Sequence, residues 1–227
     1  MVLGVIVLVQ WQTGQDAVSA KTVAERAEAA QQSLVSGLGP DTTLHAEQTR
    51  YKASNVPPGP FVLPERTHGQ FWVYLGADGK MADYRSESYD SATGTLVQTG
   101  ALVDGQIVIT DVASGETQTL PFAISADSLI EQFAAAQIET ALLVEPDAAV
   151  QSEAVAGVDT YVVDMAAGGQ SAIRRTYIDK ATYRTVKWEL LNGGVVVESR
   201  ETPVFEVLPG RAAPAPWRGE STKASIA

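Results

Sequence analysis

Apolar and polar residues alternate along the second half of the chain in short runs that end at glycine-rich turns. Within residues 159–206, Gly-Gly stands at 168–169 and Asn-Gly-Gly at 192–194. Such turns need positive φ angles, so between β-rich runs they indicate hairpins. The run 186–190 alternates apolar with charged side chains, which gives a strand one buried and one solvated face. The pattern predicts a four-stranded antiparallel meander over 159–206.

Apolar side chains spaced three and four residues apart predict two helices. The first covers residues 17–38, with Ser19 as its N-cap and Pro40 as a residue that cannot continue it. The second covers residues 125–138, where the spacing of apolar residues is again helical. Residues 141–155 fit either an extension of that helix or a further strand.

Between the two helices, β-rich runs alternate with glycine-containing turns at hairpin spacing. We expect strands at 42–53, 69–75, 81–89, 95–102 and 106–112, and a short one at 117–120. No helix of about 10–15 residues separates each strand from the next, so a parallel doubly wound sheet is not expected. The predicted fold class is α+β: one large curved antiparallel sheet with both helices against one face.

The two ends of the chain differ in composition from the middle. Residues 1–11 are apolar but too short for a whole transmembrane helix, which needs roughly 20 apolar residues, and they lack the basic start of a signal peptide. They are either the second half of a membrane anchor or a buried first strand. We therefore divide the chain into an apolar segment and linker (1–16), one domain (17–208) and a disordered tail rich in proline and small residues (209–227).

Composition narrows the choice of partners. The formal net charge is -11 and the pI is near 4.6, which argues against nucleic acid and anionic membrane surfaces. The sequence has no cysteine, so disulfides and thiolate metal sites are excluded.

A local basic cluster is nevertheless expected in the meander. Its members are Arg174, Arg175, Arg184 and Lys187. The cluster can bind an anionic headgroup or an acidic partner. Alternatively, it pairs across strands with Glu189, Glu198 and Glu201.

The sequence contains no catalytic motif. The two histidines, His45 and His68, have no second imidazole in register and no nucleophile elbow, so neither a metal nor a cofactor is expected. A hydrolase with a dispersed site is a remote alternative. It would require one of these histidines to lie beside an acid in a cleft.

One loop carries exposed apolar residues. Four prolines in residues 54–66 stiffen the segment around Phe61, Val62 and Leu63. These three side chains either cap a cavity or pack on the domain's own core.

The meander also resembles a known group. Residues 177–182 read Tyr-Ile-Asp-Lys-Ala-Thr, preceded by Thr-Tyr-Val-Val-Asp at 160–164 and followed by a returning strand at 183–189. This run is similar to the C-terminal part of the LolA-like superfamily, which includes periplasmic lipoprotein carriers and sensor domains related to RseB and mycobacterial LppX.

The resemblance implies a half-barrel whose concave face is apolar, covered by helices, and used for lipid rather than for catalysis. The implied cavity residues are Phe71, Val73, Leu129, Phe133, Tyr161, Val163, Ile178, Val186, Trp188 and Leu190. The implied lid is Phe61, Val62 and Leu63. The alternative is that the same side chains form a filled core.

We therefore expect a non-enzymatic extracytoplasmic domain, in the periplasm or on the outer face of the cell membrane, that binds a lipid or the acyl chain of a lipoprotein. The apolar residues 1–11 fit a membrane tether through the N-terminus. A lipid anchor of the kind found in lipid-anchored relatives does not fit, because the chain has no cysteine. The alternative is a membrane-tethered sensor domain of the same fold with an envelope protein as its partner.

Overall fold

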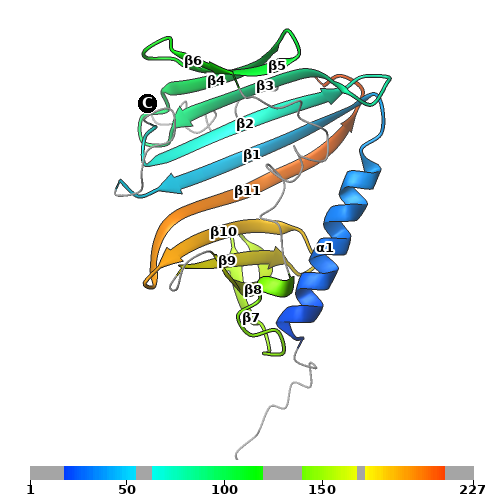
Figure 1. Ribbon diagram of the computed structural model, residues 1–227, viewed down its shortest axis with the longest axis vertical. Helices are drawn as coiled ribbons and strands as arrows, with labels where there is room; N and C mark the ends of the chain where they lie inside the picture. The colour runs from blue at the N-terminus through cyan, green and yellow to red at the C-terminus, as the bar shows by residue number, and fades with distance from the viewer. Residues whose placement is uncertain (1–17, 55–62, 120–139, 168–171, 213–227) are drawn as a thin grey trace, which may run out of the picture.

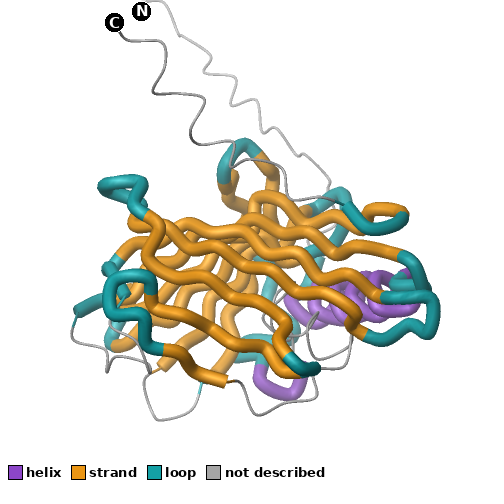
Figure 2. The backbone as a smooth tube through the Cα atoms, turned by 90° about the horizontal axis from the view of Figure 1, so that it is seen from above, coloured by secondary structure: helices purple, strands orange, loops and turns teal. Residues whose placement is uncertain are grey.

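The computed structural model describes residues 18–54, 63–119, 140–167 and 172–212. Within these ranges, eleven strands form one antiparallel sheet in the order β6-β5-β4-β3-β2-β1-β11-β10-β9-β8-β7. The sheet is open and curved, and the helix α1 (Ala20–Gly37) lies against its concave side (Figures 1 and 2). The predicted fold class is therefore confirmed.

The sheet consists of two meanders. The first comprises β1 (Thr42–Lys52), β2 (Arg66–Leu75), β3 (Met81–Asp90), β4 (Leu96–Val103), β5 (Gln106–Asp111) and β6 (Thr117–Thr119). The second comprises β7 (Gln151–Val155), β8 (Val158–Ala166), β9 (Ala172–Asp179), β10 (Thr185–Asn192) and β11 (Val195–Pro209). Every pairing inside a meander joins strands that follow one another in sequence. Short connections link these strands except β1 and β2, which residues 53–65 separate.

One long-range pairing joins the two meanders. The first strand, β1, pairs antiparallel with the last, β11, from Thr42 opposite Pro209 to Lys52 opposite Glu198. A register shift between Glu47 and Thr49 marks a bulge in this ladder, and bulges increase the local twist of a sheet. The centre of the sheet therefore depends on residues about 150 positions apart in sequence.

The helix begins close to its predicted start. The hydroxyl of Ser19 accepts a hydrogen bond from the amide of Thr22 at 3.3 Å. The amides of Ala20 and Lys21 donate to the carbonyls of Ala148 and Pro146, so the loop before β7 satisfies donors that a helix start leaves open. The predicted second helix at 125–138 lies outside the described residues. The ambiguous stretch 141–155 contains the end of a short 3₁₀ helix η1 (Thr140–Leu142) and the strand β7.

Two apolar clusters lie on the side of the sheet that faces α1. One is built on β1, β2, β3 and β5, from Leu44, Ala46, Phe71, Val73, Leu75, Tyr84 and Ile107. The other joins α1 to β8, β9 and the residue that follows η1. Its members are Ala20, Val23, Ala24, Ala27, Leu143, Val163, Met165 and Ile178. In the part of the chain that the structure describes, no helix is long and apolar enough to cross a membrane.

Candidate functional site

The two faces of the sheet carry different side chains because successive residues of a strand point to opposite sides. We call the face that carries Leu44, Phe71 and Val163 the helix-side face, since these residues lie in the clusters beneath α1. The other is the outer face. Residues directly opposite in an antiparallel ladder share a face, so the register assigns each strand position to one side.

A cleft opens on the helix-side face where two neighbouring strands separate. The strands β10 and β11 pair only from Lys187 opposite Glu201 to the hairpin turn. Beyond that point β11 continues along β1 alone, and α1 lies over the gap between β11 and β10 (Figure 1). The cleft has a volume of about 570 Å³ and a mixed lining, in which apolar Ala30, Leu34, Phe205 and Val207 lie beside polar Ser33, Thr182, Arg184 and Glu206.

A small recess continues the cleft underneath α1. It adds about 30 Å³ and shares Ala30, Leu34 and Phe205 with the cleft. Its further lining includes Ala27 of α1 and Thr185 at the start of β10. The small alanine side chains keep the helix close to the sheet while leaving this space unfilled.

Farther along the same face, two arginines stack on one tryptophan and a third lies beside them. Trp188 of β10 lies directly opposite Arg200 of β11, which in turn lies opposite Arg50 of β1. The guanidinium carbons of Arg174 and Arg200 lie 5.6 and 5.8 Å from the Trp188 ring centroid. Both distances allow a cation–π interaction. We call Arg50, Arg174, Arg200 and Trp188 the arginine cluster.

One carboxylate is paired with this cluster. Glu198 accepts a hydrogen bond from Arg50 at 2.9 Å. The pKa of Arg200 is lowered by burial first and then by the nearby charge of Arg50, while Glu198 opposes the shift. Within the described residues, Arg174 forms no hydrogen bond or ion pair, and its Nε atom is buried. Of this cluster, Arg50 is therefore paired with a carboxylate, and Arg174 stacks on Trp188.

The structure divides the basic cluster expected from the sequence between two faces. Arg175 lies on the outer face and makes two hydrogen bonds of 2.9 Å to Asp164. Lys187 pairs with Glu189 on its own strand at 2.7 Å. Arg174 alone of the expected group joins the arginine cluster. Arg50 and Arg200 carry no local sequence signal, because only the long-range pairing of β1 with β11 brings them together.

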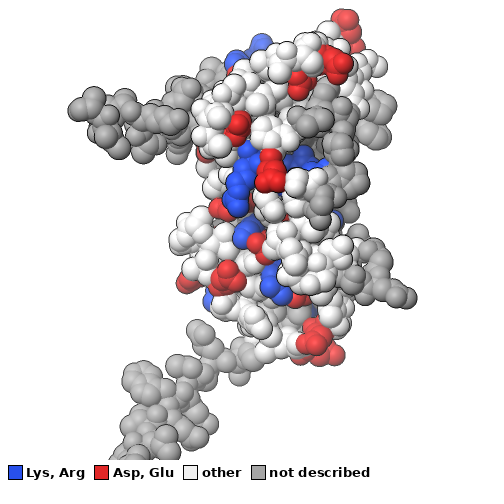
Figure 3. All heavy atoms as spheres, turned by 90° about the vertical axis from the view of Figure 1, so that its left-hand side faces the viewer, with Lys and Arg blue, Asp and Glu red and all other residues white. Residues whose placement is uncertain are grey.

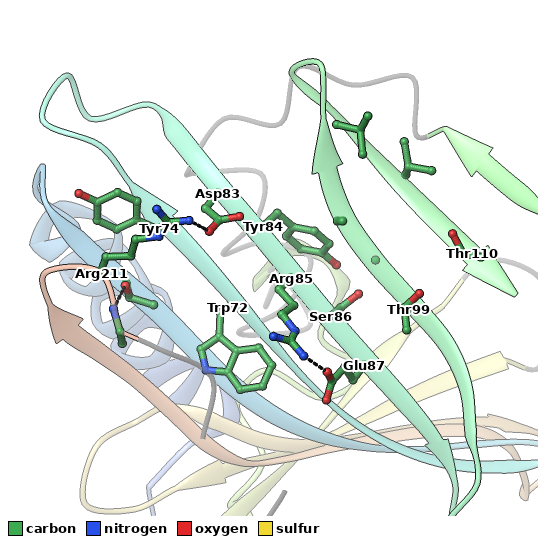
Figure 4. Close-up of a pocket in the computed structure, with 16 residues that line it drawn as sticks. Trp72, Tyr74, Asp83, Tyr84, Arg85, Ser86, Glu87, Thr99, Thr110 and Arg211 are labelled. Carbon is green, nitrogen blue, oxygen red and sulfur yellow. Dashed lines mark hydrogen bonds and ion pairs between the residues drawn. The ribbon is translucent and has the colours of Figure 1, made fainter. Parts of the chain in front are cut away.

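The outer face has a groove of its own over β2 to β5, with a volume of about 650 Å³. Figure 4 shows that Arg85 points to Glu87 and that Arg211 points to Asp83 across it. Each charge in these two pairs has an opposite partner within the groove. Arg211 follows the end of β11, so the first residues of the expected tail lie on this face.

Neither histidine presents a free ring nitrogen in a cleft. Nδ1 of His45 lies 2.9 Å from a carboxylate oxygen of Glu206, but its ring stacks on Trp72 and its Nε2 is buried without a partner. The ring of His68 stacks on Tyr89, and burial lowers the pKa of His68 while the charge of Asp90 opposes the shift. The described residues contain no group of three or more His, Asp or Glu side chains able to hold a metal ion.

The sequence-predicted cavity residues fall into three groups. Phe71 and Val73 are buried in the first apolar cluster, and Val163 and Ile178 in the second. A half-buried group on β8 and β10 comprises Tyr161, Val186, Trp188 and Leu190. Leu129, Phe133, Phe61 and Val62 lie outside the described residues, whereas the third lid residue, Leu63, is half-buried.

Comparison with known proteins gives structural matches alone. No protein-family model matches the chain, and no curated protein matches its sequence. A chain of the Pseudomonas aeruginosa MucA/MucB complex is 16% identical with a TM-score of 0.42; the match covers 85% of this chain and 58% of that one. The present chain thus spans little more than half the length of that protein.

Two further matches span nearly the whole of the other chain. LprF from Mycobacterium bovis is 11% identical with a TM-score of 0.48, and the match covers 87% of this chain and 95% of LprF. A putative outer membrane lipoprotein-sorting protein domain from Vibrio parahaemolyticus is 12% identical with a TM-score of 0.35, covering 83% and 93%. These structures have the LolA-like fold, the fold of the group that the sequence of the meander resembles.

Proposed function

We propose that this chain is a non-enzymatic extracytoplasmic domain that binds the acyl chain of a lipid or lipoprotein on the helix-side face. The observation that carries the proposal is the cleft between α1 and the separated strands β10 and β11. Its volume of about 570 Å³ lies in the range of small-molecule sites, roughly 300–1,000 Å³. The apolar part of its lining offers the environment that an acyl chain gains free energy by entering.

The path available to a chain runs from the cleft along the sheet. Phe205 in the cleft and Arg200 in the arginine cluster both belong to β11 and lie on the same face, because the bulge between them adds one residue. Their partners on β1 are four positions apart, which at about 3.3 Å per residue is roughly 13 Å. Such a distance suits an extended amphiphile. The half-buried Trp188 and Leu190 line the cluster end, and we propose that they contact it.

The placement of the domain in the cell belongs to the same proposal. We propose that residues 1–16 tether residues 17–208 to the outer face of the membrane and that residues 209–227 form a tail. The apolar residues 1–11 support the tether, and the proline and small residues of 209–227 support the tail.

The test is native mass spectrometry of the full chain purified without detergent, followed by lipid extraction. We expect a co-purifying acyl lipid near one-to-one stoichiometry, or saturable uptake of added hexadecanoate by the stripped protein. Ala30→Phe should fill the cleft and reduce uptake, since Ala30 lines it. Ala29→Phe is the matched control because Ala29 is exposed on the same helix. A clean apo mass that ignores added hexadecanoate contradicts the proposal.

A second candidate function follows from the close packing beneath α1. Val23, Ala24 and Ile178 are 0% exposed, which fits a filled core. A sensor or regulatory domain of the same fold would use such a core as a scaffold and bind an envelope protein. An apo mass in the same experiment would favour this function, and cross-linking in intact cells would then identify the partner.

A further inference from the structure

We propose that Tyr183 determines how long an acyl chain the cleft accepts, because its ring closes the inner end of the recess beneath α1. The inference rests on the proposed function and names a residue that sets the specificity of the same site. It places the apolar end of the chain against Tyr183 and the polar end outside the recess.

The turn that carries Tyr183 occurs three times in the chain. Residues 90–94, 111–115 and 179–183 read Asp-Ser-Ala-Thr-Gly, Asp-Val-Ala-Ser-Gly and Asp-Lys-Ala-Thr-Tyr. In each turn, the amide of the fifth residue donates a hydrogen bond of 2.8–2.9 Å to the carbonyl of the first. The hydroxyl of the fourth residue donates to the carboxylate of the first. The three turns therefore have the same hydrogen-bonded structure.

Two of these turns have glycine as their fifth residue, where the third has Tyr183. The backbone φ at this position is 69° at Gly94, 72° at Gly115 and 55° at Tyr183. Glycine adopts a positive φ readily, whereas the Cβ of any other L-residue comes too close to the following carbonyl oxygen. The turn itself gains nothing from a tyrosine here. Strain of this kind persists where the side chain has another role, so the contacts of the ring matter.

The ring of Tyr183 lies between the recess and the second apolar cluster. It packs against that cluster and stacks on Tyr161, with ring centroids 6.1 Å apart. Its hydroxyl accepts the 2.6 Å hydrogen bond from Arg26 of α1. The ring also lines the recess, together with the buried Ala27 and Thr185. The strained tyrosine is therefore held in place as a wall between an open space and a packed one.

The recess is the inner extension of the cleft. The residues that line both spaces are Ala30, Leu34, Arg184 and Phe205, whereas Tyr183 lines the recess alone. A chain end that passes Phe205 beneath α1 therefore meets the ring of Tyr183. The recess adds only about 30 Å³ to the cleft, so a chain gains little further length while this ring is present.

The opposite end of the path is polar. Figure 3 looks onto the end of the sheet where β1 and β10 finish, on the side away from α1, and Lys, Arg, Asp and Glu side chains are mixed there. A headgroup stays hydrated among such side chains, whereas burying it in the recess would cost the desolvation of a polar group. The apolar end of the chain is therefore the end that reaches Tyr183.

The test is displacement of a fluorescent fatty acid from the full-length protein by decanoate, dodecanoate, tetradecanoate, hexadecanoate and octadecanoate. In wild type, affinity should rise about fourfold for each methylene group that the cleft buries and then level off. Tyr183→Gly puts into this turn the residue that the other two turns have. In this variant the rise should continue for at least about two more carbons, because removal of the phenol ring leaves room for them.

Two further variants separate the ring from its hydrogen bond. Tyr183→Phe keeps the ring but removes the hydroxyl that binds Arg26, and it should keep the wild-type dependence on chain length. Tyr183→Trp enlarges the ring and should end the rise at a shorter chain. Because tryptophan keeps an aromatic ring beside Tyr161, this variant tests the inference even if circular dichroism shows that Tyr183→Gly does not fold.

The outcomes distinguish the inference from the function on which it rests. Uptake with the same length dependence in wild type, Tyr183→Gly and Tyr183→Trp overturns the inference and leaves acyl-chain binding intact. An equal shift in Tyr183→Phe and Tyr183→Gly assigns the effect to the bond with α1 and overturns it too. If only Tyr183→Gly takes up a chain, acyl-chain binding by the wild-type cleft fails and the closing role of Tyr183 is supported. If neither protein binds a chain of any length, both proposals fail.

Discussion

At the scale of single residues, two adjacent arginines have different roles because a strand directs them to opposite faces. Hydrogen bonds to Asp164 raise the pKa of Arg175, while burial opposes that shift, so this arginine is fixed in a pair on the outer face. Arg174, one position earlier, reaches Trp188 on the helix-side face. The consequence is that substituting the two should have unequal effects on stability, because Arg175 loses two charge-assisted hydrogen bonds and Arg174 loses a cation–π contact.

Trp188→Ala tests the site at this scale. Loss of the ring removes both an apolar contact and the surface on which Arg174 and Arg200 stack. We expect the affinity for a fluorescent fatty acid to fall about three- to tenfold while the fold persists, given that a cation–π contact contributes roughly 0.5–2 kcal/mol. Fluorescence titration measures the affinity and circular dichroism the fold. Trp188→Phe keeps a ring and should lose less; unchanged affinity in folded Trp188→Ala removes Trp188 from the site.

At the scale of elements, α1 stays close to the sheet because its contact stripe is made of small side chains. Ala24 is 0% exposed and lies in the cluster with Val163 and Ile178. Arg26 donates a 2.6 Å hydrogen bond to the hydroxyl of Tyr183, which ties the helix to the turn between β9 and β10. The position of α1 defines one wall of the cleft, so packing here and ligand uptake are linked.

Ala24→Leu should destabilise the protein by about 1–3 kcal/mol, because extra methylene groups have no room in a close-packed interface. The same change at exposed Ala29 of the same helix is the control and should alter the free energy of unfolding by no more than about 0.5 kcal/mol. Urea denaturation followed by circular dichroism measures both. Equal effects of the two substitutions would show that α1 does not pack on β8 and β9 as described.

At the scale of the whole molecule, acid stability depends on carboxylates with a lowered pKa, and those among the described residues all lie in the first meander. For Glu87, burial raises the pKa, but hydrogen bonds from Tyr89 and Arg85 outweigh it and the net shift is downward. The backbone amide of Ala92 lowers the pKa of Asp90, and that of Ser114 lowers the pKa of Asp111. A carboxylate whose pKa is lower in the folded than in the unfolded protein stabilises the fold at pH values above its unfolded-state pKa, near 4. This stabilisation is lost as the pH falls through the folded-state pKa.

The midpoint of thermal unfolding should therefore hold or rise slightly from pH 7 to about 5 and fall below about pH 4. Between pH 7 and about 5, repulsion within the protein becomes weaker because its net charge of -11 becomes less negative. Below about pH 4, protonation of these three carboxylates removes their contribution to stability. Scanning calorimetry across this range gives the profile. Asp111→Asn, which cannot titrate, should show a shallower fall below pH 4. A wild-type decline that begins above pH 5 would contradict this account.

The sequence by itself determined the local elements, because their signals lie within a few residues. Alternation and glycine turns predicted the hairpins from β2 to β6 and from β8 to β11, and helical spacing predicted α1 to within about three residues. The strand β7 lies in the stretch that the sequence left ambiguous, so the second meander has five strands where four were predicted. The cavity prediction named Trp188 and Leu190, which lie on the helix-side face, and their contact with a ligand stays a prediction. It also named Val163 and Ile178, whose side chains the structure places in a packed cluster, because periodicity does not separate a cavity wall from a core.

Only the tertiary structure decided how these elements meet. The pairing of β1 with β11 joins the meanders, brings Arg50 beside Arg200 and ends the pairing of β11 with β10 where the cleft opens. No turn or spacing records that contact, since about 150 residues separate the partners and their pairing depends on the closed register of the whole sheet. Local patterns specify strands, whereas the site arises where distant strands become neighbours.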